Sequence, residues 1–224
     1  MKWNVLLKSM LYPRICPACG NAIPFGRAYC VCSDSAPRTV DPDAQLIRAD
    51  DPVRLQHLCA PYYYDGRIRA QLLSLKFQSQ TVHVKPLAGA MAQQLALSFP
   101  GVSFDCVTFV PMTTDDIRER SFNQSALLAQ TIAGLLFIEC SALLVKSGPT
   151  PKQHTLSRNE RLQNLQDVFR PTARCVPGST VLLVDDIKTT GTTLSRCCEA
   201  LASAGVKDVY CVCAAVSLPR SPDF

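Results

Sequence analysis

The stretch VLLVDDIKTTGTTL, residues 181–194, decides the fold class of this chain of 224 residues. It begins with an apolar run and reaches two acids, Asp185 and Asp186, as expected of a strand buried on both faces of a parallel sheet. A run of threonines around Gly191 then leads into helical apolar spacing. The stretch therefore predicts a strand over 180–186, a tight turn and a helix over 192–205, which together form a unit of an α/β domain.

The predicted turn has the composition of a phosphate-binding loop. Its backbone N–H groups and hydroxyls converge beside the positive end of a helix dipole. Gly191 removes a side chain where the backbone must come closest to the phosphate. The loop residues are Thr189, Thr190, Gly191, Thr192 and Thr193. The two carboxylates before the loop would face the group that carries the phosphate, and ribose hydroxyls are good partners for carboxylates.

Two other interpretations of an apolar strand ending in two acids were compared with this one. A nucleoside triphosphatase would also need the G-x-x-x-x-G-K-[ST] loop, and the dipeptide Gly-Lys is absent from the sequence, which excludes that class. The other is an ordinary strand, turn and helix with solvated acids at its tip. The coincidence of acids, threonines and glycine at one strand end favours the phosphate site.

Strands and helices alternate on both sides of this stretch. Apolar patterns predict strands at 54–64, 104–112, 140–146 and 207–216. They predict helices at 67–77, 84–99, 121–134 and 156–165, whereas the polar segments 113–120 and 147–155 are predicted loops. The order predicts a doubly wound α/β domain over 51–224, whose ligands bind at the carboxyl ends of the strands.

The N-terminal part, 1–50, has a different composition and contains a cluster of cysteines. Residues 33–52 are rich in Pro, Asp and Ser and are predicted to be a linker or loop. Four of the 12 cysteines precede it, namely Cys16, Cys19, Cys30 and Cys32. The first two form a C-x-x-C knuckle, so we expect a zinc site with Cys59 as a substitute ligand; the alternative is free thiols in a loop. The pairs Cys197/Cys198 and Cys211/Cys213 are expected to pack in the core.

The composition and net charge of the chain limit the classes of protein to which it can belong. The chain is 47% hydrophobic and 18% charged, as in ordinary globular proteins, and its net charge of +5 permits an anionic partner without requiring one. No apolar run reaches the length of about 18 residues that a membrane span needs. The N-terminus shows no secretory cleavage site, so the cytoplasm is the expected compartment.

Residues 181–194 resemble the phosphoribosyl pyrophosphate (PRPP) signature of type I phosphoribosyltransferases. Four further features narrow the resemblance to the ComF (ComFC) family of competence-associated proteins. They are the cysteine cluster, LKF at 75–77, VPM followed by RERSFNQS over 110–125, and QHTLSRNERLQNLQDVF at 153–169. The resemblance covers nearly the whole chain.

This resemblance implies a type I phosphoribosyltransferase-like parallel sheet flanked by helices, preceded by a small zinc ribbon. Asp185 and Asp186 would hold the ribose hydroxyls at the catalytic centre, residues 189–193 would hold the 5′-phosphate, and magnesium would bind with PRPP. The basic residues Arg118 and Arg120 would neutralise the pyrophosphate, and Lys76 would reach a phosphate from the end of the first predicted helix. The expected partners are single-stranded DNA and proteins of the competence machinery.

The sequence departs from the family pattern at three places. Ser121 replaces the usual glycine of R-G-F-N-Q, and Lys188 replaces a residue that is commonly apolar. The second cysteine pair is Cys30-Val-Cys32 instead of C-x-x-C, and a second ribbon is missing. The sequence leaves three functions open: a phosphoribosyltransferase in natural transformation, a non-catalytic module that binds nucleotides or DNA ends, and a nucleobase salvage enzyme.

Overall fold

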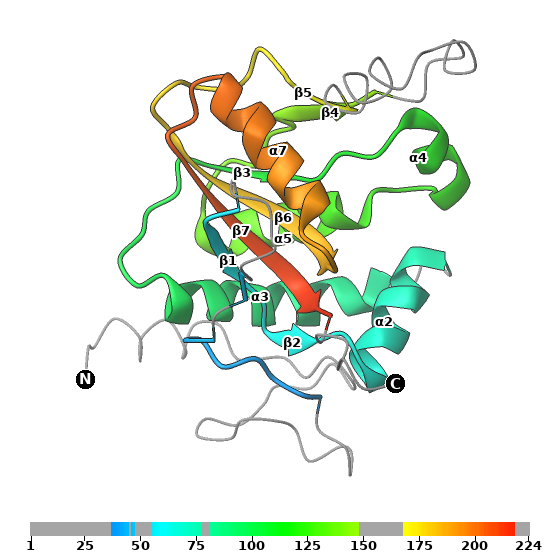
Figure 1. Ribbon diagram of the computed structural model, residues 1–224. Helices are drawn as coiled ribbons and strands as arrows, with labels where there is room; N and C mark the ends of the chain where they lie inside the picture. Colours follow the sequence, from blue (N-terminus) through cyan, green and yellow to red (C-terminus); the bar gives the residue numbers. More distant parts are fainter. Residues whose placement is uncertain (1–36, 45, 48–54, 78–80, 148–167, 218–224) are drawn as a thin grey trace.

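The computed structural model describes residues 37–44, 46–47, 55–77, 81–147 and 168–217 (Figure 1). Its centre is a parallel sheet in the order β1-β7-β6-β3, with β2 also pairing with β7. The strands are β1 (His57–Cys59), β2 (Tyr62–Tyr63), β3 (Cys106–Phe109), β6 (Thr180–Lys188) and β7 (Asp208–Val216). The predicted α/β class with a parallel sheet is confirmed.

Strand β6 lies inside the sheet, between β3 and β7. Its apolar residues Val181, Leu182, Leu183 and Val184 are fully buried. Alternate members pack in two separate hydrophobic clusters, so the strand is covered on both faces. This explains why its sequence is a continuous apolar run instead of an alternating pattern.

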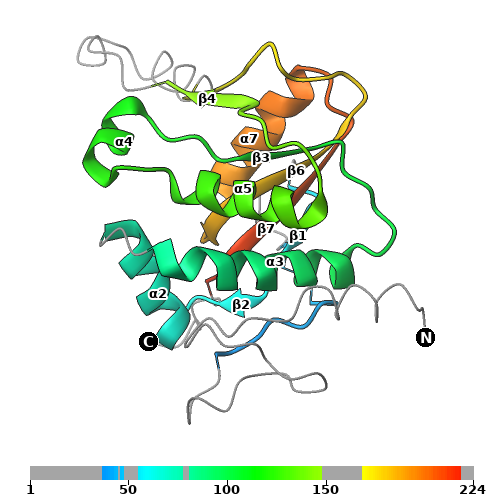
Figure 2. The ribbon, with the colours of Figure 1, turned by 180° about the vertical axis from the view of Figure 1, so that it is seen from behind.

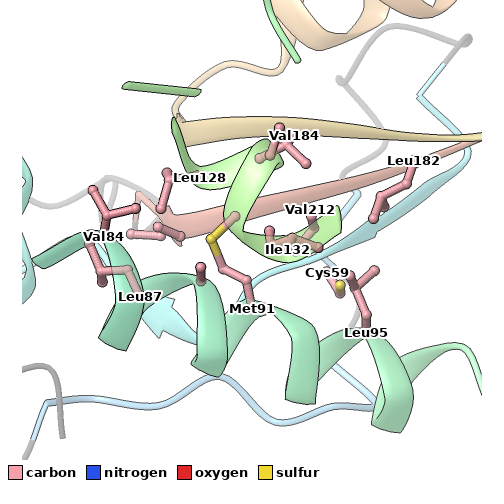
Figure 3. Packing of buried hydrophobic residues seen from close by; sticks show 14 of the residues in the cluster. Cys59, Val84, Leu87, Met91, Leu95, Leu128, Ile132, Leu182, Val184 and Val212 are labelled. Carbon is pink, nitrogen blue, oxygen red and sulfur yellow. The ribbon is translucent and has the colours of Figure 1, made fainter. Parts of the chain in front are cut away.

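Helices α3 (Val84–Ser98) and α5 (Gln124–Leu136) cover one face of the sheet, and α3 follows α2 (Gly66–Phe77) and the short 3₁₀ helix η1 (Thr81–His83) (Figure 2). Figure 3 shows the side chains of α3 and α5 meeting those of the strands in one core. This core includes Cys59, Val84, Leu87, Met91, Leu95, Leu128, Ile132, Leu182, Val184 and Val212.

Helix α7 (Thr192–Ser203) covers the opposite face, beside an antiparallel pair formed by β4 (Leu144–Lys146) and β5 (Phe169–Pro171) (Figure 1). The four cysteines that were predicted to be in the core are buried. All four belong to the hydrophobic cluster on this face, and Cys198 Sγ lies 3.7 Å from Cys211 Sγ. Burial raises the pKa of the Cys213 thiol, which keeps it neutral and unreactive.

Several predicted elements differ from the structure in extent. The predicted loop 113–120 contains helix α4 (Thr114–Arg120), because Thr113 and Asp116 form a reciprocal capping box at its start. The predicted strand 54–64 is divided into β1 and β2 around Pro61, which lacks the N–H that a sheet ladder requires. Strand β5 was not predicted, and the predicted helix 156–165 lies outside the described residues.

The described part of the predicted linker packs against the domain. Thr39 forms a β-bridge with Tyr62, and Val40 is 3% exposed in the cluster that contains α7. Ser98 Oγ donates a hydrogen bond of 3.0 Å to the Pro42 carbonyl. Residues 37–44 are therefore held as a loop on the sheet and α3. The boundary at residue 50 stays a prediction.

Within the described ranges, none of the helices combines the length and apolar character that crossing a bilayer requires.

Candidate functional site

Strand β6 continues beyond the two acids. Its ladder with β7 includes Asp185 opposite Cys213 and extends to Lys188 opposite Val216, so the strand ends at residue 188 and not at 186. The acids therefore lie within the carboxyl end of the strand. Only residues 189–191 separate the strand from α7. This short connection places the acid pair and the start of a helix next to one another.

Asp185 is held by two hydrogen bonds to a single oxygen. Ser125 Oγ and the Asp186 backbone N–H each donate to Asp185 Oδ1 at 2.9 Å. Burial raises the pKa of Asp185 well above its usual range, and the Asp186 carboxylate raises it further. The two donors act in the opposite direction by favouring the ionised form. Asp185 is 8% exposed, and since a carboxylate can accept several hydrogen bonds, the group keeps capacity for an added partner.

Asp186 is more accessible than Asp185. It is half-buried, and its Oδ1 accepts a 2.8 Å hydrogen bond from the Ile187 N–H. A carboxylate can accept several hydrogen bonds, so this contact leaves capacity for ligand hydroxyls. The two acids therefore present carboxylate oxygens at the carboxyl end of the central strand.

The loop and the start of α7 form the second part of the site. Gly191 is the N-cap residue, with φ of 75°, and no side chain caps the helix. The first-turn N–H groups of α7 are therefore available to an anion. The threonines around them are all exposed, namely Thr189, Thr190, Thr192 and Thr193, and Thr190 Oγ1 lies 3.0 Å from Thr192 Oγ1. The arrangement can receive a phosphate through amides and hydroxyls.

The start of helix α5 supports the acid pair, and sequence reasoning did not select it as part of the site. The predicted helix began near residue 121, whereas α5 begins at Gln124 with Asn123 as its N-cap. Asn123 Oδ1 accepts a 3.2 Å hydrogen bond from the Ala126 N–H. An asparagine before an apolar helical run is an N-cap signal that the sequence contained. The bond from Ser125 to Asp185 joins residues 60 positions apart, for which the sequence has no signal.

Two of the three departures from the family pattern, Ser121 and Lys188, lie near the site, and the structure around each of them accommodates it. Ser121 is the C-cap of α4 and has φ of 69° and ψ of −22°. It therefore adopts the left-handed conformation that glycine favours, at a cost of about 1 kcal/mol. Lys188 is 3% exposed, and its Nζ donates a 3.2 Å hydrogen bond to the Leu46 carbonyl. This bond gives the buried ammonium group a partner.

The predicted basic residues lie on two helices beside the site. Figure 1 shows α2 and α4 on the side of the sheet toward which β6 and β7 point. Lys76 is in the last turn of α2, and its Nζ lies 5.5 Å from the centre of the Phe77 ring. Arg118 is exposed on α4, 3.5 Å from the Asp115 carboxylate, while Arg120 is half-buried in the same helix. In the part of the chain that the structure describes, no ion pair joins Lys76, Arg118 or Arg120 to the acid pair.

Of the five cysteines considered as zinc ligands, the structure describes Cys59. The other four, Cys16, Cys19, Cys30 and Cys32, lie outside the described residues. Cys59 is 2% exposed in β1, and burial raises the pKa of its thiol far above the usual range. Its place among apolar side chains of the hydrophobic core argues against Cys59 as a substitute ligand. Among the described residues, no group of three potential ligands is arranged to hold a metal ion.

Comparison with known proteins gives consistent matches. Residues 85–221 match the family described as phosphoribosyl transferase domain. The DNA utilization protein YhgH of Salmonella typhi is 27% identical over 205 residues, covering 89% of this chain and 83% of the relative. The competence protein ComFC of Bacillus subtilis is 25% identical over 202 residues, covering 85% of this chain and 72% of the relative. Adenine phosphoribosyltransferase from Saccharomyces cerevisiae matches in structure with a TM-score of 0.41 and 19% identity, covering 63% of this chain and 72% of that chain.

The family match includes the elements that build the site. Residues 85–221 contain α4, the start of α5, the acid pair and the loop before α7. The resemblance to the ComF family is confirmed by the ComFC and YhgH relatives, whose similarity extends over most of this chain. The chain belongs to the phosphoribosyl transferase domain family.

Proposed function

We propose that this protein binds PRPP at the loop between β6 and α7 and acts as a phosphoribosyltransferase-like protein in the cytoplasmic handling of imported DNA during natural transformation. The observation that carries the proposal is the uncapped start of α7 directly beyond the acid pair. The names of the relatives, DNA utilization protein and competence protein, support the DNA context.

The residues present fit the parts of PRPP. The 5′-phosphate would bind the first-turn amides of α7 and the threonine hydroxyls around Gly191. The ribose hydroxyls would donate to Asp185 and Asp186, whose carboxylates are acceptors. Magnesium bound with PRPP would neutralise part of the pyrophosphate charge. Arg118 and Arg120 would approach the pyrophosphate from α4 as it departs. Titration of the protein with PRPP and magnesium tests this proposal, and saturable binding is the expected result.

The main alternative is a binding module without catalysis, and a nucleobase salvage enzyme is the third function. A transferase exchanges the bond between C1 of ribose and pyrophosphate for a bond to an acceptor, so it releases one pyrophosphate for each transfer. PRPP binding with pyrophosphate release only when free nucleobases are added would support salvage. PRPP binding without release, in the presence of bases or single-stranded DNA, would support the binding module.

Single-stranded DNA is expected to bind in a salt-dependent manner. If Arg118 and Arg120 each contact a phosphate, Arg118→Gln with Arg120→Gln should lower the slope of log K against log salt by about 1.4. Oligonucleotide binding measured by fluorescence anisotropy at several salt concentrations checks this. The matched control is Arg174→Gln with Lys207→Gln, which also removes two positive charges; both side chains are exposed and precede the amino ends of β6 and β7. Absence of binding by the wild type at low salt, or equal slopes in all three proteins, would contradict a role for α4 in DNA binding.

We further propose a structural zinc ion held by Cys16, Cys19, Cys30 and Cys32. A C-x-x-C knuckle and a second close pair supply the four thiolates of a tetrahedral site. Elemental analysis of protein purified without chelators is expected to find about one zinc per chain. Replacing Cys16 and Cys19 by alanine should remove it. Replacing Cys140 and Cys175, which are half-buried in the domain, should leave it in place. Folded wild-type protein without zinc would contradict the proposal.

A further inference from the structure

The first turn of helix α5 is fixed firmly to the central sheet. Asn123 caps the helix, and its Nδ2 donates a 2.9 Å hydrogen bond to the Val110 carbonyl, just beyond the end of β3. Leu128 of α5 and Val184 of β6 belong to the same buried cluster (Figure 3). Polar bonds at the helix start and apolar packing one turn later therefore hold this turn against two strands.

The next two residues extend from this fixed turn to other parts of the site. Gln124 is 3% exposed, and its Nε2 contacts the Lys76 carbonyl at 3.5 Å. Ser125 is 6% exposed, and its Oγ donates to Asp185 Oδ1 at 2.9 Å. The start of α5 thus contacts both the end of α2 and the acid pair. The Gln124 contact uses the backbone carbonyl of Lys76, which has no role in the proposed PRPP site. The Ser125 contact uses Asp185, which is proposed to bind the ribose.

We propose that Ser125 is a positioning residue that fixes the Asp185 carboxyl group for the ribose hydroxyls. The inference rests on the proposed function, since it assigns Asp185 a ligand. Ser125 and the Asp186 N–H both donate to Oδ1, which limits the rotation of the carboxyl group and so holds it in one orientation for the ligand. A buried group of this kind stays oriented only when the residues around it are held in place, and the fixed start of α5 provides that support.

Loss of Ser125 has a second consequence, in the protonation of Asp185. The Ser125 hydrogen bond favours the ionised carboxylate, so its removal raises the pKa of Asp185 further. The other titratable groups that interact with Asp185 are Asp186 on β6, Cys213 on β7 and Cys197 on α7. Burial raises the pKa of both thiols, so they stay neutral near pH 7, and Asp186 is the charged neighbour.

The test is Ser125→Ala, compared with wild type by PRPP and magnesium titration across a series of pH values. If the ionised carboxylate accepts the hydroxyls, affinity falls as pH falls through the pKa of Asp185. In the variant this fall should begin about one pH unit higher, because one hydrogen bond to a charged group has been lost. A purely structural role would lower affinity equally at every pH. NMR titration of the Asp185 carboxyl carbon in the free protein should show the same displacement.

The control is Ser179→Ala, which removes a buried serine hydroxyl just before the other end of β6 and should keep the wild-type profile. Wild-type PRPP binding with the same pH profile in Ser125→Ala would overturn this inference alone. If the wild type binds no PRPP, the proposed function fails and the ligand role of Asp185 fails with it. The NMR titration then still decides whether Ser125 controls Asp185, and an unchanged midpoint would overturn that as well.

Discussion

The double variant Asp185→Asn with Asp186→Asn is expected to bind PRPP at least about tenfold more weakly than wild type. Each lost hydrogen bond from a ribose hydroxyl to a carboxylate is worth about 1.5 to 3 kcal/mol, so two such losses exceed the energy of a tenfold change. The loss of two negative charges would by itself reduce repulsion and strengthen binding of the anionic ligand. Weaker binding would therefore reveal the loss of specific contacts. Calorimetric titration with PRPP and magnesium measures the change.

The fold should survive these substitutions. An asparagine Oδ1 at position 185 can accept the same hydrogen bonds from Ser125 Oγ and from the backbone N–H of residue 186. Because burial raises the pKa of Asp185, its ionised form opposes folding at neutral pH, and a neutral amide removes that cost. Thermal melting should therefore occur at the wild-type temperature or above it.

A matched charge control uses the other end of the sheet. Asp105→Asn with Asp208→Asn also removes two negative charges. Asp105 precedes β3 and Asp208 begins β7, so both lie at the amino ends of the strands. This control should bind PRPP as well as wild type. Equal affinity in the wild type, the acid-pair variant and the control would refute the assignment of Asp185 and Asp186.

The second large effect is expected at the glycine that begins α7. Gly191 has φ of 75°, a conformation that a β-branched residue adopts only with strain. Gly191→Val adds a side chain where the phosphate is proposed to approach the backbone, and it also disturbs the helix N-terminus. We expect PRPP affinity to fall by about tenfold or more, as for loss of one charged contact. Calorimetry and thermal melting are measured together.

Backbone strain and blocked binding can be separated with Gly178→Val. Gly178 has φ of 79° and open space around the position of an added Cβ, so valine causes the same kind of backbone strain there. It precedes β6 and lies at the other end of that strand from the loop. This variant should lose stability and keep PRPP affinity. If both glycine variants bind as tightly as wild type, the phosphate does not bind at this loop.

Much of the fold could be predicted because local pattern and burial agree. The apolar run before Asp185 has the composition of a strand covered on both faces, and β6 has that environment. Helix α4 was missed because its sequence is almost entirely polar and none of its residues is buried. Its stability comes from capping and from contacts such as Asp116 with Lys146, at 3.6 Å, instead of an apolar face.

The contacts that support the site could not be predicted from the sequence, for a different reason. The acids and the threonine loop are adjacent in sequence, so a short motif identified them. The contacts of Asp185 with Ser125, and of Lys188 with the Leu46 carbonyl, join segments 60 and 142 residues apart. Such pairs depend on how the helices and loops pack, which periodicity does not determine. Ser121 also shows that a serine can keep a turn in which glycine is usual.

The central claim is that the loop after the acid pair binds PRPP. The most direct measurement is calorimetric titration of PRPP, with magnesium, into the folded wild-type protein. We predict saturable binding of a single PRPP molecule per chain, and competition by ribose 5-phosphate, which carries the same phosphate and ribose hydroxyls. Folded protein that gives no saturable binding would contradict the account.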